Sequence, residues 1–248
     1  MRVSLNSYWT PKAGNQDDEY EDAFAPDSQP APDAGAYRFA VADGATEASY
    51  SRSWAELLVH GAVDGTLDLT DPSSLSALQR EWDARVAPLS LPWFAEEKAR
   101  QGAYAALVVL ELRDTPTRHW RASAVGDSCL FHLRAGNLQT SYPMRHAADF
   151  GISPYLIGSR CVGREVAERL EAPASDAWEP GDEFLLMSDA LACWFLTETE
   201  AGRCPAESIA HLADPNNSTP FREWVESLRQ SHNLRNDDTT LLRIAATQ

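Results

Sequence analysis

The sequence predicts an α+β domain in which antiparallel sheets carry helices on their outer faces. Two observations predict this class: the expected strands come mostly in adjacent runs, and the expected helices come in pairs between those runs. The 248 residues suffice for a large hydrophobic core, and no Pro-, Gly- or Ser-rich linker divides them. We therefore expect one domain over residues 1–248.

The N-terminal half is expected to hold two strands, then helices, then a long buried strand. Alternation marks the first strand, and an unbroken apolar run marks the second. Apolar residues recur at helical spacing from Trp54 and again after Pro72, and Pro92 suits the first position of a third helix. The expected elements are strands over 3–9, 37–42 and 105–112 and helices over 54–62, 75–86 and 92–104.

The C-terminal half begins with three strands that we expect to pair as a meander, with a hairpin turn at Ala135-Gly136-Asn137. The stretch 143–164 is rich in Gly and Pro and is expected to be irregular. A turn at Glu179-Pro180-Gly181-Asp182 precedes a further strand that ends at Asp189. The expected elements are strands over 119–125, 128–134, 138–142, 166–172, 183–189 and 239–246 and helices over 190–197, 205–213 and 220–229.

Charge and composition narrow the classes of partner and compartment. The net charge of -16 argues against a nucleic acid or an anionic membrane surface as partner. The first twelve residues have no apolar signal core, and no apolar run is long enough to span a bilayer, so we expect a cytoplasmic protein. The cysteines lack zinc-like spacing and are expected to be reduced and mostly buried; they are Cys129, Cys161, Cys193 and Cys204.

Four carboxylates stand at the ends of expected strands. Asp43 follows an apolar run and precedes Gly44, while Asp127 and Asp189 end later strands and Asp237 precedes the last one. An apolar strand that ends in Asp-Gly is more often a plain turn, but here the pattern recurs through the chain. Mg²⁺ and Mn²⁺ prefer oxygen ligands, so this set fits a metal cluster on a β-scaffold.

The order of five short motifs resembles that of the metal-dependent protein phosphatases of the type 2C (PPM) family, in its bacterial form. The motifs are Glu21-Asp22-Ala23-Phe24, Val41-Ala42-Asp43-Gly44, Val125-Gly126-Asp127-Ser128, Ser188-Asp189-Ala190-Leu191 and Asp237-Asp238-Thr239-Thr240. The match runs from Lys12 to Ile244. The resemblance implies a four-layer α-β-β-α sandwich of two antiparallel sheets flanked by helix pairs. It also implies hydrolysis of phosphoserine and phosphothreonine in proteins by a water that bridges two Mn²⁺ or Mg²⁺ ions.

The resemblance also implies a role for each matching acid. Asp43 would bridge the two ions, and the carbonyl of Gly44 would face one of them. Asp189 and Asp237 would hold the first ion, and Glu21 would attend the second largely through water. Asp22 would support the waters around the ions, and Asp127 matches the acid that holds a third, weaker ion in many bacterial members.

The chain departs from the family at the phosphate-binding cation. The family places an arginine five residues before its acidic pair, and here that position, counted back from Asp22, is Asp17. Lys12 is the nearest cation, and we expect it to seat the phosphate, although lysine lacks the bidentate fork of arginine. Because Lys12 precedes Asp17 by five residues, Asn15-Gln16-Asp17 stays open as the first motif. Glu21-Asp22 is favoured as the first motif because Ala23-Phe24 follows it, as in the family.

Other departures leave the function open to alternatives. Ala45 stands where eukaryotic members have histidine, Ala190 replaces a glycine, and glycines usual beyond Gly44 are missing. By resemblance, residues 143–164 form a flap beside the site, with Arg145 as the expected substrate contact. A pseudophosphatase that serves as a binding module remains possible, as does a two-metal hydrolase of a small phosphate ester. The physiological substrate and the oligomeric state cannot be read from the sequence.

Overall fold

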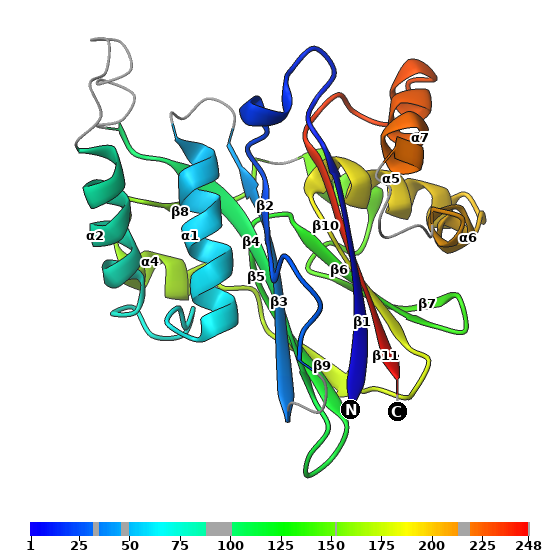
Figure 1. The fold of residues 1–248 in the computed structure, drawn as a ribbon, viewed down its shortest axis with the longest axis horizontal. Coiled ribbons are helices and arrows are strands. Elements are labelled where there is room, and N and C mark those ends of the chain that lie inside the picture. The colour runs from blue at the N-terminus through cyan, green and yellow to red at the C-terminus, as the bar shows by residue number, and fades with distance from the viewer. Residues whose placement is uncertain (32–34, 46–49, 88–100, 152, 213–218, 248) are drawn as a thin grey trace.

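Two antiparallel sheets lie face to face, and helices cover both outer sides, as Figure 1 shows. This computed structural model describes residues 1–31, 35–45, 50–87, 101–151, 153–212 and 219–247. Three apolar clusters fill the spaces between the four layers. The predicted α-β-β-α sandwich is thereby confirmed.

The first sheet contains the N-terminal strand, the C-terminal strand and three strands from the middle part of the chain. It has the strand order β1-β11-β10-β6-β7, and every neighbouring pair is antiparallel. Full pairing of β1 with β11, from Arg2 opposite Thr247 to Thr10 opposite Thr239, brings the termini side by side (Figure 1). The strands are β1 (Arg2–Thr10), β6 (Cys129–Arg134), β7 (Asn137–Tyr142), β10 (Glu183–Met187) and β11 (Thr239–Thr247).

The second sheet has the order β2-β3-β4-β5-β9, with β8 paired to the start of β4. Its two longest strands are β3 and β4, and β3 pairs with β4 over its whole length, from Ala36 opposite Arg113 to Gly44 opposite Ala105. The strands are β2 (Ala23–Ala25), β3 (Ala36–Gly44), β4 (Tyr104–Arg113), β5 (His119–Val125), β8 (Ile157–Gly158) and β9 (Ala174–Ala177).

Strand β3 is apolar on both faces because it is covered on both sides. Phe39 and Val41 face the core between the sheets, where they meet side chains such as Leu242. Ala40 and Ala42 face outward in the cluster formed with the helices, where small side chains allow close approach. Side chains alternate along a strand, so Asp43 continues the inward series and reaches the end of the space between the sheets.

The helices cover each sheet with an apolar stripe. Those on the second sheet are α1 (Ser51–Asp64), α2 (Leu75–Val86) and α4 (Gly163–Glu168), and those on the first are α5 (Asp189–Glu200), α6 (Pro205–Ala210) and α7 (Thr219–Gln230). Two short 3-10 turns, η1 (Asp17–Glu19) and η2 (Ala147–Gly151), lie in the connections. Among the described residues, no helix combines the length and the apolar character needed to cross a membrane.

Several expected elements are wrong in type or pairing. The meander does not form, because β5 belongs to one sheet and β6 to the other; only β6 and β7 form the predicted hairpin. Residues expected as the strand 166–172 instead contain the end of α4, since Val166 and Leu170 are four apart and pack on one apolar cluster. Strand β10 ends at Met187, so Asp189 is the first residue of α5.

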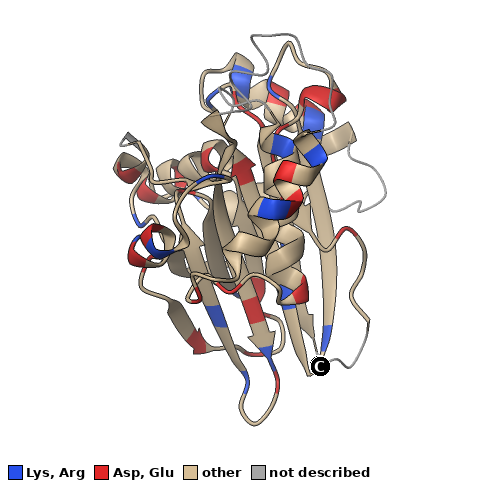
Figure 2. Ribbon diagram, turned by 90° about the vertical axis from the view of Figure 1, so that its left-hand side faces the viewer, with Lys and Arg blue, Asp and Glu red and all other residues tan. Residues whose placement is uncertain are grey.

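Two further expectations need correction or lie outside the described residues. The helix expected over 92–104 falls mostly on residues 88–100, which are not described, and Tyr104 already begins β4. All four cysteines are free thiols, but only Cys129 is buried, while Cys204 is exposed. Figure 2 shows Lys and Arg positions and Asp and Glu positions interspersed along the helices, loops and strands.

The inter-sheet core generates a stability prediction. Phe39 is fully buried between the sheets, so Phe39→Ala should lower the free energy of unfolding by about 3–5 kcal/mol through lost burial and a cavity. Val162 is 59% exposed, and Val162→Ala should change it by less than about 0.5 kcal/mol. Urea denaturation of both variants checks this, and equal effects would contradict the placement of Phe39.

Candidate functional site

Four of the predicted metal residues line a single cavity. Asp43 ends β3, Asp127 follows β5, Asp189 begins α5 and Asp237 precedes β11, and all four border a cavity of about 330 Å³ together with Gly44. The cavity lies at the end of the sandwich where β3 leads towards α1, uppermost in Figure 1. Segments up to 194 positions apart therefore converge on one site.

Gly44 permits a close approach between two motifs. A Cβ atom at this position would lie 2.4 Å from the backbone oxygen of Glu21, which is closer than real contacts allow. The pairing of Ala23 with Ala42 brings the same two segments together. The backbone contact therefore holds Glu21 and Asp22 beside Asp43, and any larger residue at position 44 would separate them.

Gly126 has a similar role in the second acidic turn. Its φ of +95° lies in the left-handed region, and a Cβ atom there would lie 2.6 Å from the Cβ of Ala106. This tight turn carries the chain from β5 in one sheet to β6 in the other. Asp127 is thereby left at the edge between the sheets with only 7% of its surface exposed.

Asp22 lies deeper than the other acids, at 2% exposure. Its Oδ2 accepts a hydrogen bond from the Thr240 hydroxyl at 2.6 Å, whereas its buried Oδ1 has no hydrogen-bond partner among the described residues. Burial, followed by the nearby charges of Asp238 and Asp189, raises the pKa of Asp22 well above its usual range. A buried carboxylate oxygen without a donor leaves room for a polar group that the protein itself does not supply.

Asp238 joins the N-terminal motif to the C-terminal one. Its Oδ1 accepts a hydrogen bond from the backbone N–H of Lys12 at 2.8 Å, and its Oδ2 accepts one from that of Glu21 at 2.6 Å. The side chain is buried at 5% exposure. Asp238 thus fixes the loop that carries Lys12 and Glu21, whereas its neighbour Asp237 reaches the cavity.

The carboxylates at the cavity raise one another's pKa. Burial and then the charges of Asp22, Asp189, Asp127 and Asp237 hold the pKa of Asp43 well above its usual range. Burial and Asp189 raise the pKa of Asp127 from 3.8 to about 7, and the same two causes raise that of Asp237. Asp43, Asp127 and Asp237 are therefore harder to ionise because they are buried and other acids are near.

The donor set fits divalent cations. The cavity offers carboxylate oxygens, which Mg²⁺ and Mn²⁺ prefer, and the Oδ1 atoms of Asp22 and Asp189 are buried without a hydrogen-bond partner among the described residues. Within the same part of the chain, however, no three His, Cys, Asp or Glu side chains are arranged as a metal site. A cation of the protein itself occupies part of the acidic cluster instead.

That cation is Arg235, which the sequence analysis missed. Its guanidinium makes a short contact with Asp189 Oδ2 and lies 3.5 Å from Asp237 Oδ2. Burial lowers the pKa of Arg235, but Asp189 and Asp237 more than offset this, and the net direction is upward. The available signal was its position two residues before Asp237, in a turn that already carried an expected ligand.

The expected substrate-binding cations lie outside the cavity lining. Lys12 Nζ is 3.9 Å from Glu21 Oε2, and both residues border a neighbouring hollow. Arg145 is exposed, and its backbone N–H donates a hydrogen bond to Asp149 Oδ2 at 3.0 Å. The segment 143–164 nevertheless reaches the acids, because its members Phe150, Ser153, Pro154 and Leu156 form part of the cavity wall.

Asp17, the alternative acid of the first motif, has a different environment. Arg222 donates two hydrogen bonds to it, at 3.0 and 3.1 Å, and Arg52 donates one to its backbone oxygen at 3.3 Å. Asp17 is exposed and does not border the acidic cavity, whereas Asp22 raises the pKa of Asp43. The geometry favours Glu21-Asp22 as the acidic pair of the site.

Solved structures with the same fold cover almost the whole chain. PppA, described as a key regulatory component of T6SS in Pseudomonas aeruginosa, aligns at a TM-score of 0.59 and 21% identity over 99% of this chain and 98% of its own. The Mycobacterium tuberculosis serine/threonine phosphatase PstP/Ppp aligns at a TM-score of 0.62 and 16% identity over 100% of both chains. The catalytic domain of PstP in complex with two manganese ions aligns at 0.59 and 19% identity over 99% of both.

No protein-family model and no curated relative matches this chain. The structural likeness therefore rests on the path of the backbone rather than on sequence similarity. It shows that the chain has the fold of the PPM serine/threonine phosphatases, as the order of its motifs predicts.

The crowded acids generate a prediction about pH. Between about pH 4 and 7 the folded protein holds a proton on Asp127 that the unfolded chain releases, so stability is lost as the pH rises through this range. The raised pKa values of Asp43 and Asp22 act in the same direction. In EDTA, the melting temperature should therefore fall from about pH 5 to about pH 8. Asp127→Asn should flatten the fall, and a wild-type melting temperature that rises steadily over this range would contradict the prediction.

Proposed function

We propose that this protein hydrolyses phosphoserine and phosphothreonine in other proteins with two Mn²⁺ or Mg²⁺ ions. The observation that carries the proposal is the position of Asp43 at a cavity bordered by acids from separate segments, where burial and the charges of four other acids raise its pKa. Such crowding destabilises the metal-free fold and is offset when divalent cations bind. The serine/threonine phosphatases that share the fold supply the substrate class.

The residues at the cavity fit the roles that the reaction requires. Asp43 lies among the other acids, where it would contact both ions, and the Gly44 carbonyl borders the same space. Asp189 and Asp237 would hold one ion and Asp127 a third. Bound divalent ions supply hydroxide near neutral pH by lowering the pKa of water, and they offset charge on the phosphoryl oxygens.

The N-terminal acids would act beside the ions. Glu21 would attend the second ion, and the unpartnered Oδ1 of Asp22 would accept a hydrogen bond from a water next to the ions. Lys12, held close by the Asp238 contact to its backbone, would supply positive charge at the approach. No covalent intermediate with the protein is needed, because activated water is the nucleophile.

The domain, the partner and the compartment of the proposed enzyme can be inferred from the structure and the composition. The proposed enzyme is one phosphatase domain over residues 1–248, in which residues 143–164 form a flap beside the cavity. The flap is supported by Phe150 and Leu156, which border the cavity. The partner would be a phosphorylated protein, and the acidic net charge disfavours nucleic acid. Free thiols at all four cysteines support a reducing compartment such as the cytoplasm.

One observation favours a second candidate function. The ion pairs of Arg235 with Asp189 and Asp237 balance part of the acidic charge without any metal, as a pseudophosphatase that only binds partners would require. The two candidates differ in what Mn²⁺ does to the protein. An enzyme gains stability and activity from the ion, whereas a binding module that has lost the metal site gains neither.

The first test measures hydrolysis and melting on wild type and Asp43→Asn. Wild type should hydrolyse para-nitrophenyl phosphate and a phosphothreonine peptide with Mn²⁺ and lose activity in EDTA. Asp43→Asn should lose more than about 100-fold in rate and most of the Mn²⁺-induced rise in melting temperature. Without metal it should melt no lower than wild type, because one repelling charge is gone. A wild type that shows no shift with millimolar Mn²⁺ would favour the binding module.

The second test separates the two candidate acids of the first motif. Asp22→Ala should lower the rate by on the order of 10–100-fold, as removal of groups that support metal-site ligands commonly does. Asp17→Ala should change it less than about threefold, because an exposed ion pair with Arg222 contributes little. Initial rates at saturating Mn²⁺ decide the ranking, and the reverse order would make Asn15-Gln16-Asp17 the first motif.

A further inference from the structure

Arg235 is the one cation, within the described residues, that borders the acidic cavity. Four carboxylates share this border with it, and its guanidinium contacts two of them, Asp189 and Asp237. Lys12 lies at a neighbouring hollow beside Glu21, and Arg145 is not part of the lining. Any anion that enters the cavity would therefore meet positive charge from the protein at Arg235.

The two partners of the Arg235–Asp189 ion pair differ in exposure. The Arg235 side chain is 53% exposed, whereas that of Asp189 is 14% exposed. The arginine thus contacts the acids from the solvent side, and more than half of its own side chain is exposed. Ion pairs with an exposed partner contribute little to stability, so a divalent cation can replace this one at small cost.

Arg235 and a divalent cation require the same oxygen atoms. The guanidinium contacts Oδ2 of Asp189 and lies near Oδ2 of Asp237, while Oδ1 of Asp189 is buried without a hydrogen-bond partner among the described residues. Two positive groups cannot both lie against these carboxylates without repelling each other. Occupation of the site by metal would therefore release the guanidinium into the adjacent cavity.

A released guanidinium at this cavity suits a phosphoryl group. Its planar fork can donate two hydrogen bonds to a pair of phosphate oxygens, which the ammonium group of lysine cannot do in the same fixed geometry. In the N-terminal loop, the position where the family resemblance implies a phosphate-binding arginine is occupied by an acid, Asp17. Asp17 forms an ion pair with Arg222. Among the described residues that border the cavity, only Arg235 can supply such a fork.

We propose that Arg235 is a counter-ion with two states, which neutralises Asp189 and Asp237 in the metal-free protein and binds the substrate phosphoryl group once divalent cations replace it. The proposal rests on the proposed phosphatase function. It assigns to Arg235 the phosphate-binding role for which the sequence offered Lys12. It also makes the arginine a competitor of the metal, which can be measured without any turnover.

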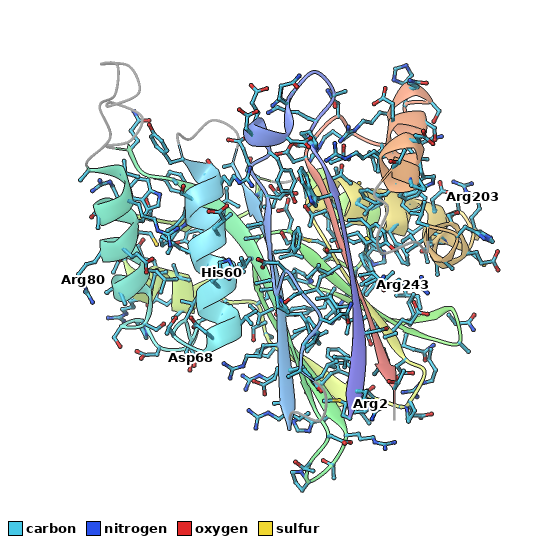
Figure 3. The ribbon with its side chains drawn as sticks, viewed as in Figure 1. Arg2, His60, Asp68, Arg80, Arg203 and Arg243 are labelled. Carbon is cyan, nitrogen blue, oxygen red and sulfur yellow. The ribbon has the colours of Figure 1, made fainter. Side chains whose placement is uncertain are left out.

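The first experiment titrates the metal without substrate. Calorimetric titration with MnCl₂ should show tighter binding to Arg235→Gln than to wild type, by on the order of tenfold, because the competing charge is gone. In EDTA the variant should melt at a lower temperature than wild type, and its rise with Mn²⁺ should be larger. Arg203→Gln is the matched control: Arg203 pairs with Glu198, is 58% exposed and lies beside α6 at the outer edge of the molecule (Figure 3).

The second experiment measures phosphate binding at saturating Mn²⁺. Arg235→Gln should raise KM for a phosphothreonine peptide and the inhibition constant of inorganic phosphate, each by on the order of tenfold. Arg235→Lys keeps the charge without the fork and should fall between wild type and Arg235→Gln in both experiments. Because the lysine variant preserves charge balance, it keeps the test decisive if the glutamine variant fails to fold. Arg203→Gln should leave both constants unchanged.

The outcomes separate this inference from the function on which it rests. An active wild type whose Arg235 variants match it in Mn²⁺ affinity and phosphate inhibition would overturn the role of Arg235 and leave the phosphatase function intact. Weaker Mn²⁺ binding in Arg235→Gln would also overturn it, since the arginine would then support the metal rather than compete with it. A wild type that neither binds Mn²⁺ nor hydrolyses phosphate esters would overturn the proposed function, and this inference with it.

Discussion

The layers of the sandwich have to hold several carboxylates close together, and largely out of water, at one end of the molecule. Asp22, Asp43, Asp127 and Asp237 all have raised pKa values, and burial is the largest cause for each. A fold that needed only stability would place apolar or paired groups there. The acids are instead kept close by backbone pairing and by glycines that no other residue could replace, so the surrounding layers must be rigid enough to oppose their separation.

That rigidity comes from contacts that span almost the entire chain. The full register between β1 and β11 sets the two ends of the protein side by side. Asp238 then accepts hydrogen bonds from the backbone of Lys12 and Glu21, and Arg229 on α7 donates to the backbone oxygens of Pro11 and Asp237. The N-terminal and C-terminal parts of the site therefore form a single unit, although they lie more than 200 residues apart in sequence.

The sequence predicts the fold class and the acids because both depend on local pattern. The apolar run that ends in Asp43 can be recognised from its own residues without knowledge of the sheet, and the order of such runs points to a known family. Pairing and direction are not local: strand spacing cannot show that Gly126 sends the chain from one sheet to the other. For the same reason the roles of Arg235 and Asp238 could not be predicted, since they depend on where side chains from distant segments meet. The prediction of a strand over 166–172 was wrong because the spacing of four between Val166 and Leu170 fits an alternating strand as well as a helix.

The balance of charge at the cavity connects its stability to its chemistry. A site that must bind divalent cations has to be acidic, yet an acidic site repels a phosphate ester. A fixed cation among the acids would relieve both problems but would also block the metal. As we propose for Arg235, whose side chain is 53% exposed, an arginine at the rim avoids this conflict because it can neutralise the acids when no metal is bound and turn to the phosphoryl group in the adjacent cavity when metal is bound. Lys12 is poorly placed to perform both tasks, neutralising these acids and then turning to the phosphoryl group. Its backbone is held by Asp238, and its Nζ lies beside Glu21.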